Sequence, residues 1–165
     1  MRSGMHTLIL STGSNLGKRM KNLESALLQI EQSLGKINKS SAVYESSSWG
    51  YESENLFYNQ CLVVLTRHGL EDCLHIIQDI ERKFGRQHNV IGYHDRSLDI
   101  DILFYNQMIL DTKGLKVPHP RIPERKFVLV PLAEILPDWE HPVLHKTIRE
   151  LLSECKDSLD VYPAG

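Results

Sequence analysis

The order in which strand-like and helix-like hydrophobic patterns follow one another constrains the fold of this 165-residue chain most strongly. Short β-rich runs predict strands, and apolar residues recurring every three or four positions predict two helices that each bury one face. The strands are expected over 7–12, 36–47, 56–67 and 98–105, and the helices over 16–34 and 70–84. This β-α-β-β-α-β order predicts an α+β, ferredoxin-like fold, with an antiparallel sheet, both helices on one face and the other face free for a substrate.

The remainder of the chain is expected to add less regular structure to this framework. A turn at residues 106–107 predicts a hairpin that joins strand 98–105 to residues 108–110. Beyond a proline-marked stretch, short helices are expected over 127–136 and 147–152. The predicted fold is therefore a ferredoxin-like unit with an irregular helical C-terminal part.

The turn before the first helix resembles a phosphate-binding loop but does not match one. Residues 13–18 (Gly-Ser-Asn-Leu-Gly-Lys) are one residue short of the Walker A spacing, and Arg19 replaces the hydroxyl residue that would hold magnesium. We therefore interpret the segment as a tight turn in which Ser14 or Asn15 caps the helix, while Gly35 ends it.

Composition excludes several classes of protein. A net charge of -2 and a pI of about 6.4 provide no basic field for nucleic acid, and no apolar run approaches the length of a membrane span. Cys61, Cys73 and Cys155 have neither disulfide-framework nor zinc spacing, which is typical of a reducing compartment. We expect a single domain over 1–165, with residues 1–4 as a loose extension, that is cytoplasmic and monomeric and has no nucleic-acid or membrane partner.

The run Leu98-Asp99-Ile100-Asp101-Ile102 is the sharpest chemical feature. Side chains alternate along a strand, so both carboxylates project from one face while the aliphatic residues enter the core. Two neighbouring carboxylates on an apolar strand repel each other, and a divalent cation removes that cost. Mg²⁺ is the natural occupant, because it is held by one or two carboxylates together with substrate phosphates. The alternative is that both aspartates simply face water.

Basic side chains flank this pair on both sides. Upstream lie Arg86, His88, His94 and Arg96, and downstream lie His119, Arg121, Arg125 and Lys126. Guanidinium groups match phosphate oxygens bidentately, so the cluster indicates a metal-polyphosphate ligand. The alternative is that these arginines are solvated surface charges. His119 stands between Pro118 and Pro120, which pins its ring, although a surface loop histidine is the simpler alternative.

A second group of side chains suits a flat heteroaromatic ligand. Asn59 and Phe57 share one face of the third strand, and Trp49, Tyr51 and Tyr93 come from two loops. Stacking aromatics around a buried amide match a ring that carries hydrogen-bonding groups along one edge. A plain aromatic core is the alternative.

Five motifs in order, spread over essentially the whole chain, resemble the 6-hydroxymethyl-7,8-dihydropterin pyrophosphokinases of folate biosynthesis. The motifs are Gly13-Ser14-Asn15-Leu16, Phe57-x-Asn59, Glu81 to Gly85-Arg86, Arg96-Ser97-Leu98-Asp99-Ile100-Asp101-Ile102-Leu103, and Val117-Pro118-His119-Pro120-Arg121 followed by Phe127. The resemblance implies an enzyme that moves diphosphate from MgATP to a pterin alcohol and releases AMP.

The resemblance also implies roles on the nucleotide side. Asp99 and Asp101 are expected to hold two Mg²⁺ ions that bridge the ATP phosphates and the pterin hydroxyl. Arg86 and Arg96 are expected to lie on a mobile loop that closes over the phosphates and to serve catalysis. The other expected nucleotide contacts are Gln78, Glu81, His119 and Arg121.

On the pterin side, the resemblance implies that Asn59 reads the edge of the ring. The side chains expected around it are Phe57, Tyr93 and Phe127, together with Ser46, Ser47 and Trp49 of the first pterin loop. This loop lacks the proline of the commoner Thr-x-Pro-x-Gly pattern, and Tyr93 stands where tryptophan is common. These departures bear on loop closure and ATP affinity more than on the type of reaction.

Two other functions are alternatives to this one. A palm-like nucleotidyltransferase also pairs strand aspartates, but its Gly-Ser turn lies about a dozen residues before them, whereas Gly13-Ser14 lies far upstream of Asp99. A non-catalytic ferredoxin-like binding module would leave Asp99 and Asp101 as ordinary surface charges, and nucleotide binding would then not depend on a divalent metal.

Overall fold

The computed structural model describes residues 4–85, 93 and 95–165. Its main sheet contains β1 (His6–Ser14), β2 (Lys36–Ser40), β3 (Tyr44–Ser46), β4 (Phe57–Thr66), β5 (Asp99–Tyr105) and β8 (Val161–Pro163). The strand order is β5-β1-β4-β3-β8, with β2 also paired to β4, and every pairing is antiparallel. The helices α1 (Arg19–Ser33) and α2 (Leu70–Lys83) connect the strands in the expected order, so the α+β, ferredoxin-like prediction is confirmed.

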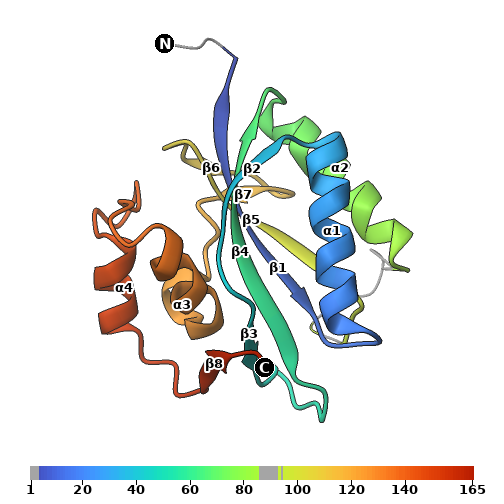
Figure 1. The fold of residues 1–165 in the computed structure, drawn as a ribbon. Helices are drawn as coiled ribbons and strands as arrows, with labels where there is room; N and C mark the ends of the chain where they lie inside the picture. The colour runs from blue at the N-terminus through green and yellow to red at the C-terminus, as the bar shows by residue number, and fades with distance from the viewer. Residues whose placement is uncertain (1–3, 86–92, 94) are drawn as a thin grey trace.

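Helices α1 and α2 lie on one face of the sheet (Figure 1). An apolar core fills the space between them and the strands. Leu8 and Leu10 of β1 pack there with Ile30 of α1 and Ile77 of α2, all at most 2% exposed. Gly35 follows α1 at a point where a Cβ atom would collide with the carbonyl oxygen of Leu65, so close packing against β4 requires the glycine.

The opposite face is covered over part of its length, which corrects the expectation of a free face. There α3 (Lys126–Ile135) and α4 (Ile148–Glu154) lie across the sheet from α1 and α2 (Figure 1). The second core joins Leu129 and Ile148 of these helices to Ile9, Val63 and Phe104 of the strands. The two short C-terminal helices were predicted, but their apolar stripes did not reveal which face of the sheet they cover.

Two strand predictions are wrong in detail. The run 36–47 is broken into β2 and β3, because Ser41 turns inward and its Oγ accepts a hydrogen bond from the amide of Cys61 at 3.0 Å. Residues 106–107 do not start a hairpin with β5. Instead β6 (Leu110–Asp111) pairs with β7 (Lys116–Val117) in a separate small sheet, and η1 (Ile122–Glu124) follows.

The start of α1 also differs from the prediction. The helix begins at Arg19, and neither Ser14 nor Asn15 caps it, because both side chains bond to other partners. Gly17 adopts a φ of +71° in the turn between β1 and α1, a conformation that favours glycine. Among the described residues, no helix combines the length and apolar character needed to cross a membrane.

Candidate active site

The face of the sheet that carries α3 and α4 is called the second face here. The part of it that these helices leave uncovered forms the floor of a pocket. On β1, Gly13 lies between Asp99 of β5 and Asn59 of β4, and Ser11 lies between Asp101 and Cys61. Small residues in the middle strand keep this floor low, so the carboxylates and the amide face one shared space. The pocket encloses about 660 Å³, part of it open to solvent.

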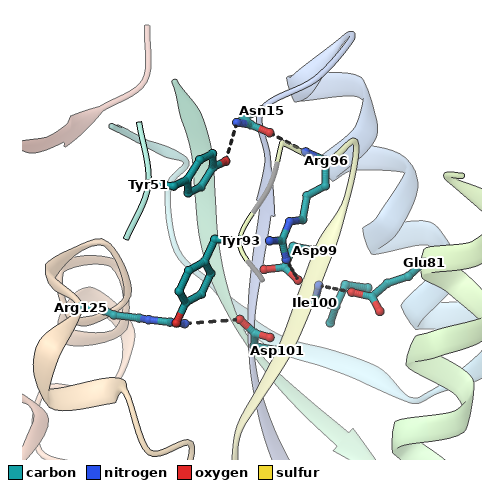
Figure 2. Close-up of polar contacts among 9 residues, drawn as sticks. All are labelled: Asn15, Tyr51, Glu81, Tyr93, Arg96, Asp99, Ile100, Asp101 and Arg125. Carbon is teal, nitrogen blue, oxygen red and sulfur yellow. Dashed lines mark hydrogen bonds and ion pairs between the residues drawn. The ribbon is translucent and has the colours of Figure 1, made fainter. Parts of the chain in front are cut away.

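The two aspartates lie as the strand alternation predicts. Asp99 and Asp101 are half-buried and line the pocket, while Ile100 between them enters the first core. Each carboxylate meets an arginine: Arg96 Nη1 lies 3.0 Å from Asp99 Oδ1, and Arg125 Nη1 lies 3.9 Å from Asp101 Oδ2 (Figure 2). The arginines therefore offset the repulsion between the two carboxylates.

This donor set fits Mg²⁺. Hard oxygen ligands on one face of one strand suit the ion, which usually completes its shell with water and substrate phosphate oxygens. Among the described residues, no group of three acidic, histidine or cysteine side chains forms a metal site built from protein ligands alone. The two carboxylates match the kind of Mg²⁺ site whose shell substrate phosphate oxygens complete.

Arg125 organises an aromatic wall at one side of the pocket. Its guanidinium carbon lies 4.6 Å from the ring centroid of Trp49, 5.7 Å from that of Phe127 and 5.9 Å from that of Tyr93. Trp49 and Tyr93 meet edge to face with centroids 5.7 Å apart, and Arg125 donates a hydrogen bond to the Tyr93 hydroxyl at 3.3 Å. Aromatic faces and a planar cation side by side suit a flat ligand.

Asn59 forms the polar element opposite this wall. The residue is 2% exposed, and its Nδ2 donates to Ser46 Oγ at 2.8 Å. Phe57, Ser46 and Ser47 line the same pocket. The structure thus brings together every residue expected on the pterin side, from β3, the loop after it, β4, the segment before β5 and the start of α3.

His119 reaches the pocket from the segment after β7. The peptide bond between Val117 and Pro118 is cis, and the His119 amide donates to the carbonyl oxygen of Leu103 at 2.9 Å. Its Nδ1 accepts a hydrogen bond from the Arg121 amide at 3.1 Å. Burial, together with the nearby Arg125, lowers the pKa of His119 to about 4, so the ring is neutral at pH 7 with its proton on Nε2.

Other residues expected on the nucleotide side lie elsewhere. Glu81 is 4% exposed, and its Oε2 accepts a hydrogen bond from the amide of Ile100 at 2.8 Å, which holds the outer edge of β5 against α2 (Figure 2). Gln78 of α2 and Arg121 do not line the pocket, and Arg121 instead pairs with Glu124 at 3.2 Å. Arg86 lies outside the described residues.

Sequence reasoning did not single out Arg125 within its basic cluster. Arg125 precedes α3 with extended backbone angles (φ -120°, ψ 97°), and its side chain turns inward and is 10% exposed. The sequence offered only the pattern of Arg125 and Phe127 on either side of Lys126 at a predicted helix start. Ser11 and Gly13 were also missed as lining residues, because their place depends on strand register.

The chain is similar to known pyrophosphokinases. The sequence model of 7,8-dihydro-6-hydroxymethylpterin-pyrophosphokinase (HPPK) matches residues 9–137. The 2-amino-4-hydroxy-6-hydroxymethyldihydropteridine pyrophosphokinase of Synechocystis sp. is 33% identical over 97% of this chain and 81% of that protein. The protein of the same name from Porphyromonas gingivalis is 39% identical over 84% of this chain and 95% of its own length.

A solved structure supports the fold. The Plasmodium falciparum HPPK-DHPS wild type with pteroate superimposes with a TM-score of 0.74 at 19% identity, over 91% of this chain. The chain spans 44% of that longer protein.

Proposed function

The chain belongs to the 7,8-dihydro-6-hydroxymethylpterin-pyrophosphokinase family and is a pyrophosphokinase of folate biosynthesis, and on this premise we propose how its pocket acts. The reaction transfers diphosphate from ATP to the hydroxymethyl group of 6-hydroxymethyl-7,8-dihydropterin and releases AMP. One observation carries the assignment to this pocket: the Asp99 and Asp101 carboxylates share a floor with the buried amide of Asn59. The end of the pocket proposed to bind phosphate and the end proposed to bind the pterin ring thus lie within one cavity.

The pterin ring is proposed to lie between Phe57 and Phe127, with its amide edge toward Asn59. A buried asparagine side chain offers a donor and an acceptor side by side, which matches the alternating groups along a pterin edge. The Ser46 hydroxyl keeps the asparagine amide in place through their 2.8 Å hydrogen bond. The hydroxymethyl arm then points along the floor toward the aspartates.

Asp99 and Asp101 are proposed to hold two Mg²⁺ ions together with the ATP phosphates. When bound, the ions neutralise phosphate charge and lower the pKa of the attacking hydroxyl. Arg96 and Arg125 already lie against these carboxylates, so they stand next to the position where the phosphates would bind. Their guanidinium groups add charge stabilisation at the phosphate oxygens.

The chemical step is proposed as an in-line displacement. The hydroxymethyl oxygen attacks the β-phosphorus, a new P–O bond forms, and the bond from the β-phosphorus to the oxygen shared with the α-phosphorus breaks, so that AMP leaves. The hydroxyl proton passes to the carboxylate of Asp99 or Asp101. His119 is neutral, and its Nε2–H is free to donate to a phosphate oxygen, because its Nδ1 already accepts the Arg121 amide.

A product assay tests this proposal. The protein is incubated with MgATP and 6-hydroxymethyl-7,8-dihydropterin, and the nucleotide released is identified by chromatography. We expect AMP in a one-to-one ratio with pterin diphosphate, and no product after magnesium is chelated. ADP would contradict diphosphate transfer, and the absence of any nucleotide product from folded, metal-replete protein would contradict catalysis at this pocket.

We also propose that residues 1–165 act as one domain and as a monomer in the cytoplasm. The two cores lie on opposite faces of one sheet, which supports one folding unit. Cys61, Cys73 and Cys155 are all free thiols, as is usual in a reducing compartment. Light scattering coupled to gel filtration tests the monomer: a mass of 19.0 kDa is expected, and twice that mass would contradict it.

A further inference from the structure

One carboxylate outside the pocket accepts four hydrogen bonds from other side chains. Asp95 Oδ1 accepts from Asn15 Nδ2 and from the Tyr51 hydroxyl, each at 2.8 Å. Asp95 Oδ2 accepts from Ser53 Oγ at 3.0 Å and from Asn55 Nδ2 at 2.8 Å. Each carboxylate oxygen therefore accepts two hydrogen bonds. Asp95 belongs neither to the pair of proposed magnesium ligands nor to the residues proposed to contact the pterin ring.

The donors come from segments far apart in the sequence. Asn15 follows β1, the other three donors lie between β3 and β4, and Asp95 lies just before β5. Tyr51 itself lines the pocket. One side chain thus joins the turn before α1, the loop that carries Trp49, and the segment that leads into the metal-binding strand.

Asn15 extends the connection to Arg96. The Asn15 amide donates to the Arg96 carbonyl oxygen at 3.0 Å, and Asn15 Oδ1 accepts from the Arg96 amide at 2.7 Å (Figure 2). The Arg96 guanidinium in turn lies 3.0 Å from Asp99. Because the backbone of Arg96 is fixed on both sides, the position from which its side chain reaches the phosphate end is fixed as well.

We propose that Asp95 is a positioning residue for diphosphate transfer, which sets the place of Arg96 and Tyr51 at the mouth of the pocket through a clasp made of Asn15, Tyr51, Ser53, Asn55 and Asp95. The inference rests on the function proposed above and deepens it. Asp95 does not line the pocket. It acts by holding the loop of the pterin side and the arginine of the nucleotide side in one relative geometry.

The electrostatics of the clasp suit this role. Burial acts to raise the pKa of Asp95, but the four donated hydrogen bonds outweigh it and lower the pKa, so the side chain is an acceptor-only carboxylate at neutral pH. Burial and the bond to Asp95 raise the pKa of Tyr51 to about 12, so its hydroxyl keeps the proton that it donates. No proton uptake is needed to complete the clasp.

Steady-state kinetics of three variants test the proposal. Asp95→Ala removes all four bonds, and Asp95→Asn keeps the shape but replaces one acceptor oxygen with a donor. Asp138→Ala is the matched control, because Asp138 forms an exposed ion pair with Arg149 at 3.2 Å and is absent from the pocket lining. We expect Asp95→Ala to raise KM for the pterin about tenfold and to lower kcat several-fold, with Asp95→Asn intermediate and the control unchanged.

A second readout separates positioning from a general loss of stability. Amide hydrogen exchange by NMR should speed up at Arg96 and at residues 49–55 in Asp95→Ala, while Val161 and Tyr162 of β8 keep the wild-type rate. Wild-type kcat and KM in Asp95→Ala, or unchanged exchange at Arg96, would overturn the proposal. If wild-type protein releases no AMP, the proposed function fails instead, and the exchange at Arg96 still decides whether the clasp exists.

Discussion

The two ends of the second face of the sheet differ sharply, although the same three strands build both. At one end Ile9 pairs with Val63 and Phe104, and α3 and α4 cover this row. Four residues further along β1, Gly13 pairs with Asn59 and Asp99, and this row stays open. The β1–β5 register shifts between Ile9 and Leu10, which allows both Leu103 and Phe104 to enter the second core.

The residues that stabilise the fold and the residues proposed for the reaction therefore lie at different ends of the same strands. A helix packed over the row that contains Asp99 would desolvate charged groups at a large free-energy cost. Helices α3 and α4 therefore leave the polar part of the strands uncovered. The apolar end anchors α3, and Arg125, just before this helix, and Phe127, in its first turn, both line the open end. Each of the four predictions below concerns a residue at one end of this face, and states how activity or stability should respond. They are ordered from the largest expected effect to the smallest.

The largest effect is expected at the open end. Asp99→Ala removes a proposed magnesium ligand, so kcat should fall about a thousandfold or more, because metal stabilisation of the transition state is worth several kcal/mol. The melting temperature should change by no more than a few degrees. The control is Asp111→Ala, an exposed aspartate of β6, which should keep wild-type turnover. Wild-type turnover in Asp99→Ala would show that this pocket is not the active site.

The reverse pattern is expected at the covered end. Phe104 is 1% exposed, so Phe104→Ala should lower the free energy of unfolding by about 3–5 kcal/mol in urea titrations. At a temperature where the variant remains folded, kcat should stay within about threefold of wild type, a change of well under 1 kcal/mol. A thousandfold loss of kcat in folded Phe104→Ala would show that the two ends are not separate.

A smaller effect is expected from narrowing the floor of the pocket. A Cβ at Gly13 would lie 3.2 Å from Asn59 Oδ1 and 3.6 Å from Phe57 Cδ1. Gly13→Ala should therefore raise KM for the pterin about tenfold through a shift of the Asn59 amide, with a smaller change in KM for ATP. Gly114→Ala, where no heavy atom lies within 4 Å of the new Cβ, is the control. Equal increases in both KM values would contradict the placement of the pterin at Asn59.

The smallest effect concerns the pH dependence of stability. His119 has its pKa lowered from 6.5 to about 4, so the unfolded chain takes up a proton near pH 6.5 while the folded protein does not. His119 therefore reduces stability progressively as pH falls from 6.5 to about 4 and has a constant effect above that range. An NMR titration should show no protonation of His119 between about pH 6 and 8. A midpoint near 6.5 would contradict its burial in the pocket, and His119→Gln should flatten the decline in melting temperature.

The covered and open ends were predictable from the sequence to different degrees. Alternation along β5 correctly placed Asp99 and Asp101 on one face, because the period of a strand requires no knowledge of its neighbours. The row that joins Asp99 to Gly13 and Asn59 was not predictable, since register between distant strands is set by packing and by the bulge near Ile9. No sequence motif marks the clasp at Asp95, because the donors of its hydrogen bonds come from two loops that meet only in the folded chain.

Calorimetric binding of a non-hydrolysable ATP analogue tests the central claim most directly. Wild-type protein is titrated with the analogue in the presence and absence of Mg²⁺, and so are the double variant Asp99→Asn, Asp101→Asn and the covered-end variant Phe104→Ala. We predict magnesium-dependent binding in wild type and in folded Phe104→Ala, and loss of the magnesium dependence in the double variant. Equal binding by the double variant, or binding that ignores Mg²⁺ in wild type, would show that the open end of the sheet does not hold the metal nucleotide.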